Sequence, residues 1–202
     1  MAKTSGSVRG VSIRGGKEGA DSSYKGEIKK IGSLKELKDR KLQKDLQQGI
    51  SKFESRLAVR TTVKLADLNG AYGVHVTSNG KSDGVYLDRK SFKTYDQVRK
   101  AKLAAYKSKF SNRTNKPTQH TVVHELAHAL WTNHHTGDKQ KKAAIEIGVL
   151  YRTFKRRNPK SWGSYSKTNI NEFFAEGITK GLLGKPDSYT KALIKISKKY
   201  GL

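Results

Sequence analysis

Several residue types are rare or missing in this chain of 202 residues, which has no cysteine, three prolines and one methionine, Met1. The absence of cysteine excludes a disulfide framework and any metal site built from thiolates, and it fits a reducing compartment such as the cytoplasm. No apolar run is long enough for a transmembrane helix, and the first ten residues lack the apolar core of a secretory signal. We therefore expect neither membrane insertion nor disulfide bonds.

Acidic residues are also scarce, because 17 Asp and Glu stand against 42 Lys and Arg and leave a formal net charge of +25. A field this positive attracts polyanions, acidic proteins or anionic membranes. No nucleic-acid-binding motif and no interleaved aromatic residues accompany the charge, so sequence-specific readout is not expected. Two interpretations stay open: a lysine-rich solubilising surface, and non-specific association with nucleic acid or another polyanion.

The chain divides into a short arm and one domain. Residues 1 to about 26 are rich in Gly, Ser, Lys and Arg and offer almost nothing to bury. This composition predicts a flexible basic arm within residues 1–30. The remaining residues, 31–202, suffice for a single domain with its own core.

Alternating helix and strand patterns predict an α+β fold. A capping box at Ser33–Glu36 predicts a helix that continues to Leu57. Further helices are predicted over about 94–110, 121–131, 138–157, 171–177 and 187–200. Strands are predicted over 61–68, 72–77 and 84–87, with turns at Asn69-Gly70 and Asn79-Gly80. We expect a small, mostly antiparallel sheet packed with several helices.

The most informative stretch is His124-Glu125-Leu126-Ala127-His128, inside an apolar helical run from 121 to 131. Residues i and i+4 share one helical face, so both imidazoles can bind one ion. Glu125 lies about 100° further round the helix, where it can hold a water without ligating the metal. Two histidine ligands and a general base are typical of a zinc hydrolase with one catalytic ion.

A zinc site of this kind needs a third protein ligand. His134 has the spacing used by one group of metalloproteases, but that longer motif needs a glycine where this chain has Trp131. His134 and His135 therefore fit better as the polar end of the helix. Glu172 and Glu176 offer another source, because they share a helical face beside two phenylalanines. One carboxylate could bind zinc while the other fixes the tautomer of a ligating histidine.

Residues 164–176, which end in Glu-Phe-Phe-Ala-Glu, resemble the second zinc segment of the anthrax lethal factor family of zinc metallopeptidases (gluzincins). Similar segments occur in related toxin and phage-encoded metallopeptidases. The resemblance implies that His124, His128 and Glu172 bind zinc and that Glu125 is the general base. It further implies that Glu176 supports a ligand and that Tyr165 stabilises the oxyanion.

The same resemblance implies a zincin-like domain and a protein or peptide substrate. In such enzymes an extended substrate adds to an edge of the sheet, and Gly84–Asp88 is the candidate strand. The small, basic chain is also compatible with a phage-encoded protein that processes virion proteins.

The sequence thus supports two functions from different classes. The first is a zinc-dependent endopeptidase with Glu125 as general base. The alternative is a basic, nucleic-acid-associated structural or packaging protein whose metal helix is not catalytic. A protease held near DNA by its charge would combine the two.

Overall fold

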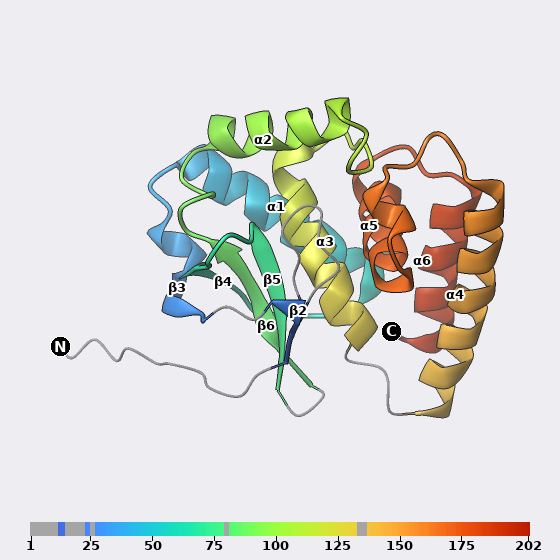
Figure 1. The fold of residues 1–202 in the computed structure, drawn as a ribbon. Coiled ribbons are helices and arrows are strands. Elements are labelled where there is room, and N and C mark those ends of the chain that lie inside the picture. The colour runs from blue at the N-terminus through green and yellow to red at the C-terminus, as the bar shows by residue number, and fades with distance from the viewer. Residues whose placement is uncertain (1–11, 15–22, 25–26, 79–80, 133–136) are drawn as a thin grey trace.

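The computed structural model describes residues 12–14, 23–24, 27–78, 81–132 and 137–202 (Figure 1). Within these ranges a sheet packs against helices, which confirms the α+β class. The helices are α1 (Arg40–Leu57), α2 (Tyr95–Lys107), α3 (Pro117–Thr132), α4 (Asp138–Arg157), α5 (Ile170–Leu183) and α6 (Ser188–Tyr200). None of these helices has the length and apolar character needed to cross a membrane.

The sheet has six strands in the order β2-β1-β5-β6-β4-β3. They are β1 (Ser12–Arg14), β2 (Ser23–Tyr24), β3 (Lys29–Ser33), β4 (Val63–Asp67), β5 (Gly73–Ser78) and β6 (Lys81–Asp88). Only the β4–β6 pairing is parallel, so the sheet is mixed but mostly antiparallel, as expected. Residues 1–26 were expected to form an arm, and apart from β1 and β2 they lie outside the described residues. The predicted Asn79-Gly80 turn also lies outside them.

The prediction that Gly84–Asp88 forms a sheet edge was wrong. These residues belong to β6, which lies between β5 and β4 and pairs with both of them. The physical reason is that β6 is apolar on both faces: Val85 and Leu87 enter the main core, whereas Tyr86 enters a second one. A strand buried on both faces suits the interior of a sheet.

The first predicted helix starts later than its capping box suggested. The box at Ser33 and Glu36 forms, but it opens a 3₁₀ turn (Leu34–Glu36) instead of a long helix. The chain becomes extended at Leu37, and α1 begins after Asp39. Asp39 is the stronger cap because one oxygen accepts from Leu42 N at 3.0 Å and the other from Tyr95 N at 2.7 Å. The two bonds also tie the start of α1 to the start of α2.

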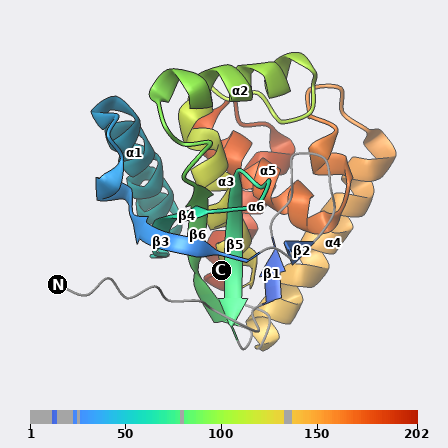
Figure 2. The same cartoon turned by 60° about the vertical axis from the view of Figure 1, so that its left-hand side comes forward.

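The sheet separates two apolar cores. Alternate side chains of a strand point to opposite faces, so Leu65, Val85 and Leu87 pack toward the helices. The opposite face carries a smaller cluster of Ile28, Ala66, Leu68, Ala71, Val74, Val76 and Tyr86. Figure 2 shows the strands on the near side of α3, with α5 beyond it.

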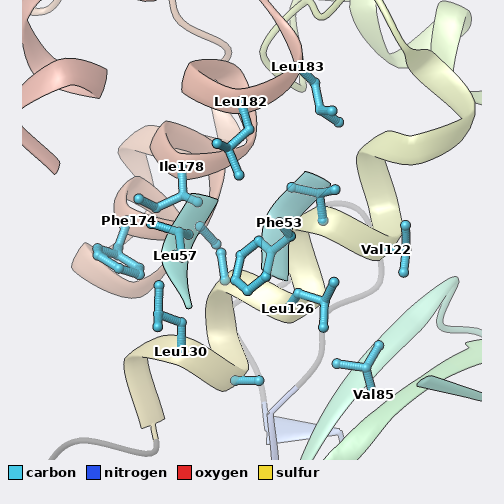
Figure 3. Packing of buried hydrophobic residues seen from close by; sticks show 14 of the residues in the cluster. Phe53, Leu57, Val85, Val122, Leu126, Leu130, Phe174, Ile178, Leu182 and Leu183 are labelled. Atoms are coloured by element: carbon cyan, nitrogen blue, oxygen red, sulfur yellow. The ribbon is translucent and has the colours of Figure 1, made fainter. Parts of the chain in front are cut away.

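Helix α3 is the centre of the molecule. It contacts β5 and β6 on one side and α1, α2 and α5 on the others. The apolar interface of α1, α3 and α5 is shown in Figure 3, where Phe53, Leu126 and Ile178 meet. Because every residue from 118 to 131 is buried, α3 has no solvent-facing side over this range. Any polar group on α3 must therefore find its partners inside the protein.

Candidate metal centre

Three histidines of α3 lie one turn apart on a single buried face. They are His120, His124 and His128, spaced at i, i+4 and i+8. Helix α5 presents Glu172 and Glu176 to them with the same spacing. Near α5's start, the side chain of Asn169 accepts from Glu172 N at 2.9 Å and so fixes the first turn of the helix.

The two helices interleave these side chains in the alternating order His128, Glu172, His124, Glu176, His120, here called the His–Glu ladder. Glu172 Oε2 lies 3.1 Å from His124 Nε2 and 3.3 Å from His128 Nε2. Glu176 Oε1 lies 3.3 Å from His124 Nδ1 and 2.9 Å from His120 Nε2. Each neighbouring pair therefore joins an imidazole to a carboxylate across the α3–α5 interface.

Three ladder atoms converge as zinc ligands would. His124 Nε2 and His128 Nε2 are 3.1 Å apart, and Glu172 Oε2 completes a triangle with sides of 3.1, 3.1 and 3.3 Å. A tetrahedron with metal–ligand distances of about 2.0–2.1 Å has edges of about 3.3 Å. Glu172 Oε2 is buried and lies against both imidazole nitrogens. The donor set and its spacing thus fit a zinc ion.

The electrostatics of the triangle favour a cation. Burial alone would lower the pKa of His124, but hydrogen bonds and the charges of Glu172 and Glu176 raise it to about 10. Burial would likewise raise the pKa of Glu172, yet the charges and hydrogen bonds of His128 and His124 hold it well below its ordinary value. The two carboxylates thus stabilise positive charge at this point, whether a proton or a metal ion supplies it.

Glu125 lies beside the triangle but is not part of it. Its side chain is buried, its Oε2 has no hydrogen bond among the described residues, and burial raises the pKa of its carboxyl. Strand β5 leaves it room, because a Cβ added to Gly73 would lie 2.9 Å from Glu125 Cγ. A buried carboxylate with a raised pKa and a free oxygen has the properties of a general base.

Tyr165, on a 3₁₀ turn (Tyr165–Lys167), reaches the same place from a distant part of the chain. Its ring stacks on His124 with centroids 5.7 Å apart and on Phe110 at 4.9 Å. It lines a small cavity of about 30 Å³ together with His124, Glu125 and Glu176. Burial and the negative charges of Glu172 and Glu125 raise the pKa of the phenol, so its O–H stays available as a donor.

Asn112 connects the ladder to the segment that carries Tyr165. Its backbone N–H donates to Glu176 Oε2 at 2.7 Å, and its side-chain oxygen accepts from Gly163 N, also at 2.7 Å. Tyr165 N in turn donates to Phe110 O at 2.9 Å. At Gly163 an added Cβ would lie 2.4 Å from Phe110 O, so no larger residue fits. The segments around 110–112 and 163–165 are therefore held in register.

The structure brings together all six residues singled out in the sequence: Glu125, Tyr165, His124, His128, Glu172 and Glu176. His134 and His135, which were considered and set aside as ligands, lie outside the described residues. Three supporting residues were missed. The spacing of His120, one turn before His124, could have revealed it, whereas Lys102 and Asn112 carry no local signal. Lys102 is buried on α2 and lines the cavity; its charge adds to burial in lowering the pKa of His120, and it offsets part of the rise that burial causes in the pKa of Glu125.

Comparisons with protein-family models, with curated proteins and with solved structures gave no match to this chain. The resemblance to the lethal factor family therefore depends on two short segments, one around His124 and one around Glu172. The structure adds that these segments form adjacent helices whose polar faces meet.

Proposed function

We propose that this protein is a zinc-dependent endopeptidase. The observation that carries the proposal is the triangle of His124 Nε2, His128 Nε2 and Glu172 Oε2, with sides of 3.1–3.3 Å. Beside it lies Glu125 Oε2, which has no hydrogen bond within the part of the chain that the structure describes. One zinc ion held there would lower the pKa of a water and polarise the scissile carbonyl of a peptide. A lethal factor-like, zincin-like domain is part of the same proposal.

Glu125 is the proposed general base. Its carboxylate would take a proton from the attacking water and deliver it to the leaving amine. The raised pKa makes the carboxylate a better proton acceptor than an exposed glutamate, while the charges of His124 and His128 counteract this rise. Gly73 leaves room for this side chain beside β5, because an added Cβ there would lie 2.9 Å from Glu125 Cγ.

Tyr165 and Glu176 have supporting roles in the proposal. The phenolic O–H of Tyr165, on the same cavity as Glu125, would donate to the carbonyl oxygen as negative charge develops there. Glu176 would accept from His124 Nδ1 and leave the lone pair of Nε2 for the metal. Strand β6 is interior, and so is β5, the strand that borders Glu125, because β5 pairs with both β1 and β6; the edges of the described sheet are β2 and β3.

The direct test is cleavage of a random peptide library by the zinc-loaded protein, read by mass spectrometry. Glu125→Gln is expected to retain zinc but to lose about 10²–10⁴-fold in turnover, the usual contribution of a general base. Glu146→Gln is the matched control, because Glu146 lies on α4 and pairs with Lys199 away from the ladder. Equal cleavage by the wild type and Glu125→Gln would refute the assignment.

Polyanion association is a second candidate function, supported by the net charge of +25. Binding of DNA that weakens steeply with salt and is unchanged by chelation of zinc would support it. Such binding without any peptide cleavage would favour the structural or packaging function over the peptidase.

A further inference from the structure

His120 is the last member of the His–Glu ladder, next to Glu176 and nearest the start of α3. It is almost completely buried, and its two ring nitrogens have different partners. Nε2 lies 2.9 Å from Glu176 Oε1, and Nδ1 lies 3.0 Å from the hydroxyl of Tyr106. The Tyr106 hydroxyl is also 2.6 Å from Thr114 Oγ1. A continuous chain of polar contacts therefore leads from Thr114 to the carboxylate beside His124.

The chemistry of the groups fixes the direction of this chain. An ionised carboxylate can only accept hydrogen bonds, so the proton of His120 must be on Nε2. Burial, with the charge of Lys102, lowers the pKa of His120 to about 4, so the ring is neutral at pH 7 and Nδ1 is an acceptor. Tyr106 then donates to Nδ1, and Thr114 donates to Tyr106. Every donor in the chain points toward Glu176.

His120, His124 and Glu176 could also be considered a second metal site, since their ligand atoms lie within 4.8 Å of one another. Their hydrogen bonds point to a different role. Both oxygens of Glu176 already accept hydrogen bonds, Oε1 from His120 and Oε2 from Asn112 N. The positive charge of buried Lys102 also disfavours a cation near His120.

We propose that His120 is a positioning residue for the metal centre: its Nε2–H holds Glu176 in the orientation that fixes the tautomer of His124. This inference rests on the proposed function, because it assumes that His124 Nε2 binds zinc. His120 itself contacts neither the ion nor the substrate. Loss of the hydrogen-bonded partner of a metal ligand typically costs about 10–100-fold in affinity, and His120 acts one step further out through Glu176, so about tenfold, the lower end of this range, is expected.

Two substitutions test whether zinc affinity depends on the hydrogen bond from position 120 to Glu176 or only on a polar side chain at that position. In His120→Gln the side-chain amide reaches the position of Nε2 and can donate to Glu176. In His120→Asn the amide reaches only the position of Nδ1, near Tyr106. Zinc affinity, measured by competition with a chelator, should fall about tenfold in His120→Asn and remain near the wild-type value in His120→Gln.

The matched control is His75→Asn, which makes the same change at a fully buried histidine of β5, bonded to Ser82 Oγ at 3.0 Å. Its zinc affinity should not change. Equal affinities in the wild type, His120→Gln and His120→Asn would overturn the proposal, as would equal losses in both variants. Two zinc ions per chain, one of them lost in His120→Asn, would overturn it too, because His120 would then be a ligand.

A second measurement does not depend on zinc. Nitrogen-15 NMR of the metal-free protein at pH 7 reports which ring nitrogen of His120 carries the proton. A proton on Nε2 is expected, and a proton on Nδ1 would contradict the proposal. If the wild type binds no zinc, the proposed function fails, while the NMR result still decides whether His120 donates to Glu176.

Discussion

Helices α3 and α5 each carry two sets of buried side chains that share one spacing but differ in chemistry. The His–Glu ladder is the first set. The second, here called the apolar ladder, consists of Val122, Leu126 and Leu130 on α3 and Phe174, Ile178 and Leu182 on α5. Both sets repeat every fourth residue, and every member is buried. Figure 3 shows these six side chains together with Phe53 and Leu57 of α1.

The difference between the two ladders indicates which one the fold needs and which one function needs. Apolar side chains stabilise the helix pair by leaving water, and similar volumes can replace one another at modest cost. Buried imidazoles and carboxylates cost free energy unless each finds a partner. A helix pair selected for stability alone would not need five such groups, so the His–Glu ladder is explained best by its chemistry.

Among the variants considered, Glu172→Ala should cause the largest loss of zinc affinity. Removing a direct ligand is expected to weaken zinc binding by more than the roughly 10–100-fold typical of outer partners. Titration with zinc against a competing chelator measures the loss, and circular dichroism checks that the variant folds. His134→Ala should bind zinc like the wild type. The reverse pattern would show that His134, not Glu172, completes the site.

Ile178→Ala tests the apolar ladder on the same helix as Glu172. Deleting a large, fully buried side chain should lower the free energy of unfolding by about 2–5 kcal/mol, measured with chemical denaturant. Zinc affinity of the folded protein should change by no more than about threefold, because the substitution removes no ligand. A loss of zinc affinity as large as that of Glu172→Ala would mean that the two ladders are not separable.

Zinc affinity should depend on pH. In the metal-free protein the pKa of His124 is raised to about 10, so zinc must displace a proton at pH 7. The apparent affinity should therefore rise about tenfold per pH unit between roughly pH 7 and 9. Calorimetry in buffers with different ionisation enthalpies should detect about one proton released per zinc. Affinity independent of pH in this range would show that His124 is already neutral.

The raised pKa of His124 also predicts how the stability of the metal-free protein depends on pH. Because the pKa of His124 is raised in the folded state, its contribution is fully present below about pH 6.5 and disappears as pH rises through about 10. Denaturant unfolding of the metal-free wild type at pH 7 and pH 10 measures this loss. His124→Gln should show a smaller difference between the two pH values.

Asp187→Ala should have the smallest effect, a modest loss of stability with no change in zinc affinity. Asp187 caps α6, accepting from Thr190 N at 3.0 Å, and pairs with Lys180 Nζ at 2.8 Å. Its removal should cost about 0.5–2 kcal/mol of stability. Zinc affinity should not change, although Lys180 lies on α5 one turn beyond Glu176. A change in zinc affinity would extend the functional part of α5 to Lys180.

The residues of the ladder were predictable because helical periodicity is local. His124 and His128, or Glu172 and Glu176, share a face in any α-helix, and their apolar neighbours predicted burial. His120 satisfied the same spacing but lies four residues before the His-Glu-x-x-His pattern. A search for that pattern alone therefore missed it.

The rest of the site depends on contacts between distant parts of the chain. Asn112 meets Glu176 across 64 residues, and no local feature of the segment around 112 marks it as a partner. Lys102 is buried on α2 against the same cavity, although its helix is otherwise basic and exposed on most positions. Such contacts follow from the packing of α2 and α5 around α3, which periodicity does not specify.

The order of the strands in the sheet could not be predicted from local sequence either. The positions of β4, β5 and β6 along the chain followed from alternating residues and turns, but the order of the strands did not. A short apolar segment can be an edge or an interior strand, and only its pairing with β4 and β5 placed β6 inside. The start of α1 depended on a bond from Tyr95 N to Asp39, which joins residues 56 positions apart.

The most direct test of the metal centre is X-ray absorption spectroscopy at the zinc edge, on wild-type protein loaded with one equivalent of zinc. The spectrum should show two imidazole ligands with oxygen in the remaining positions, and Glu172→Ala should lose this signature. Three imidazoles, or zinc that retains only water ligands, would contradict a centre formed by His124, His128 and Glu172.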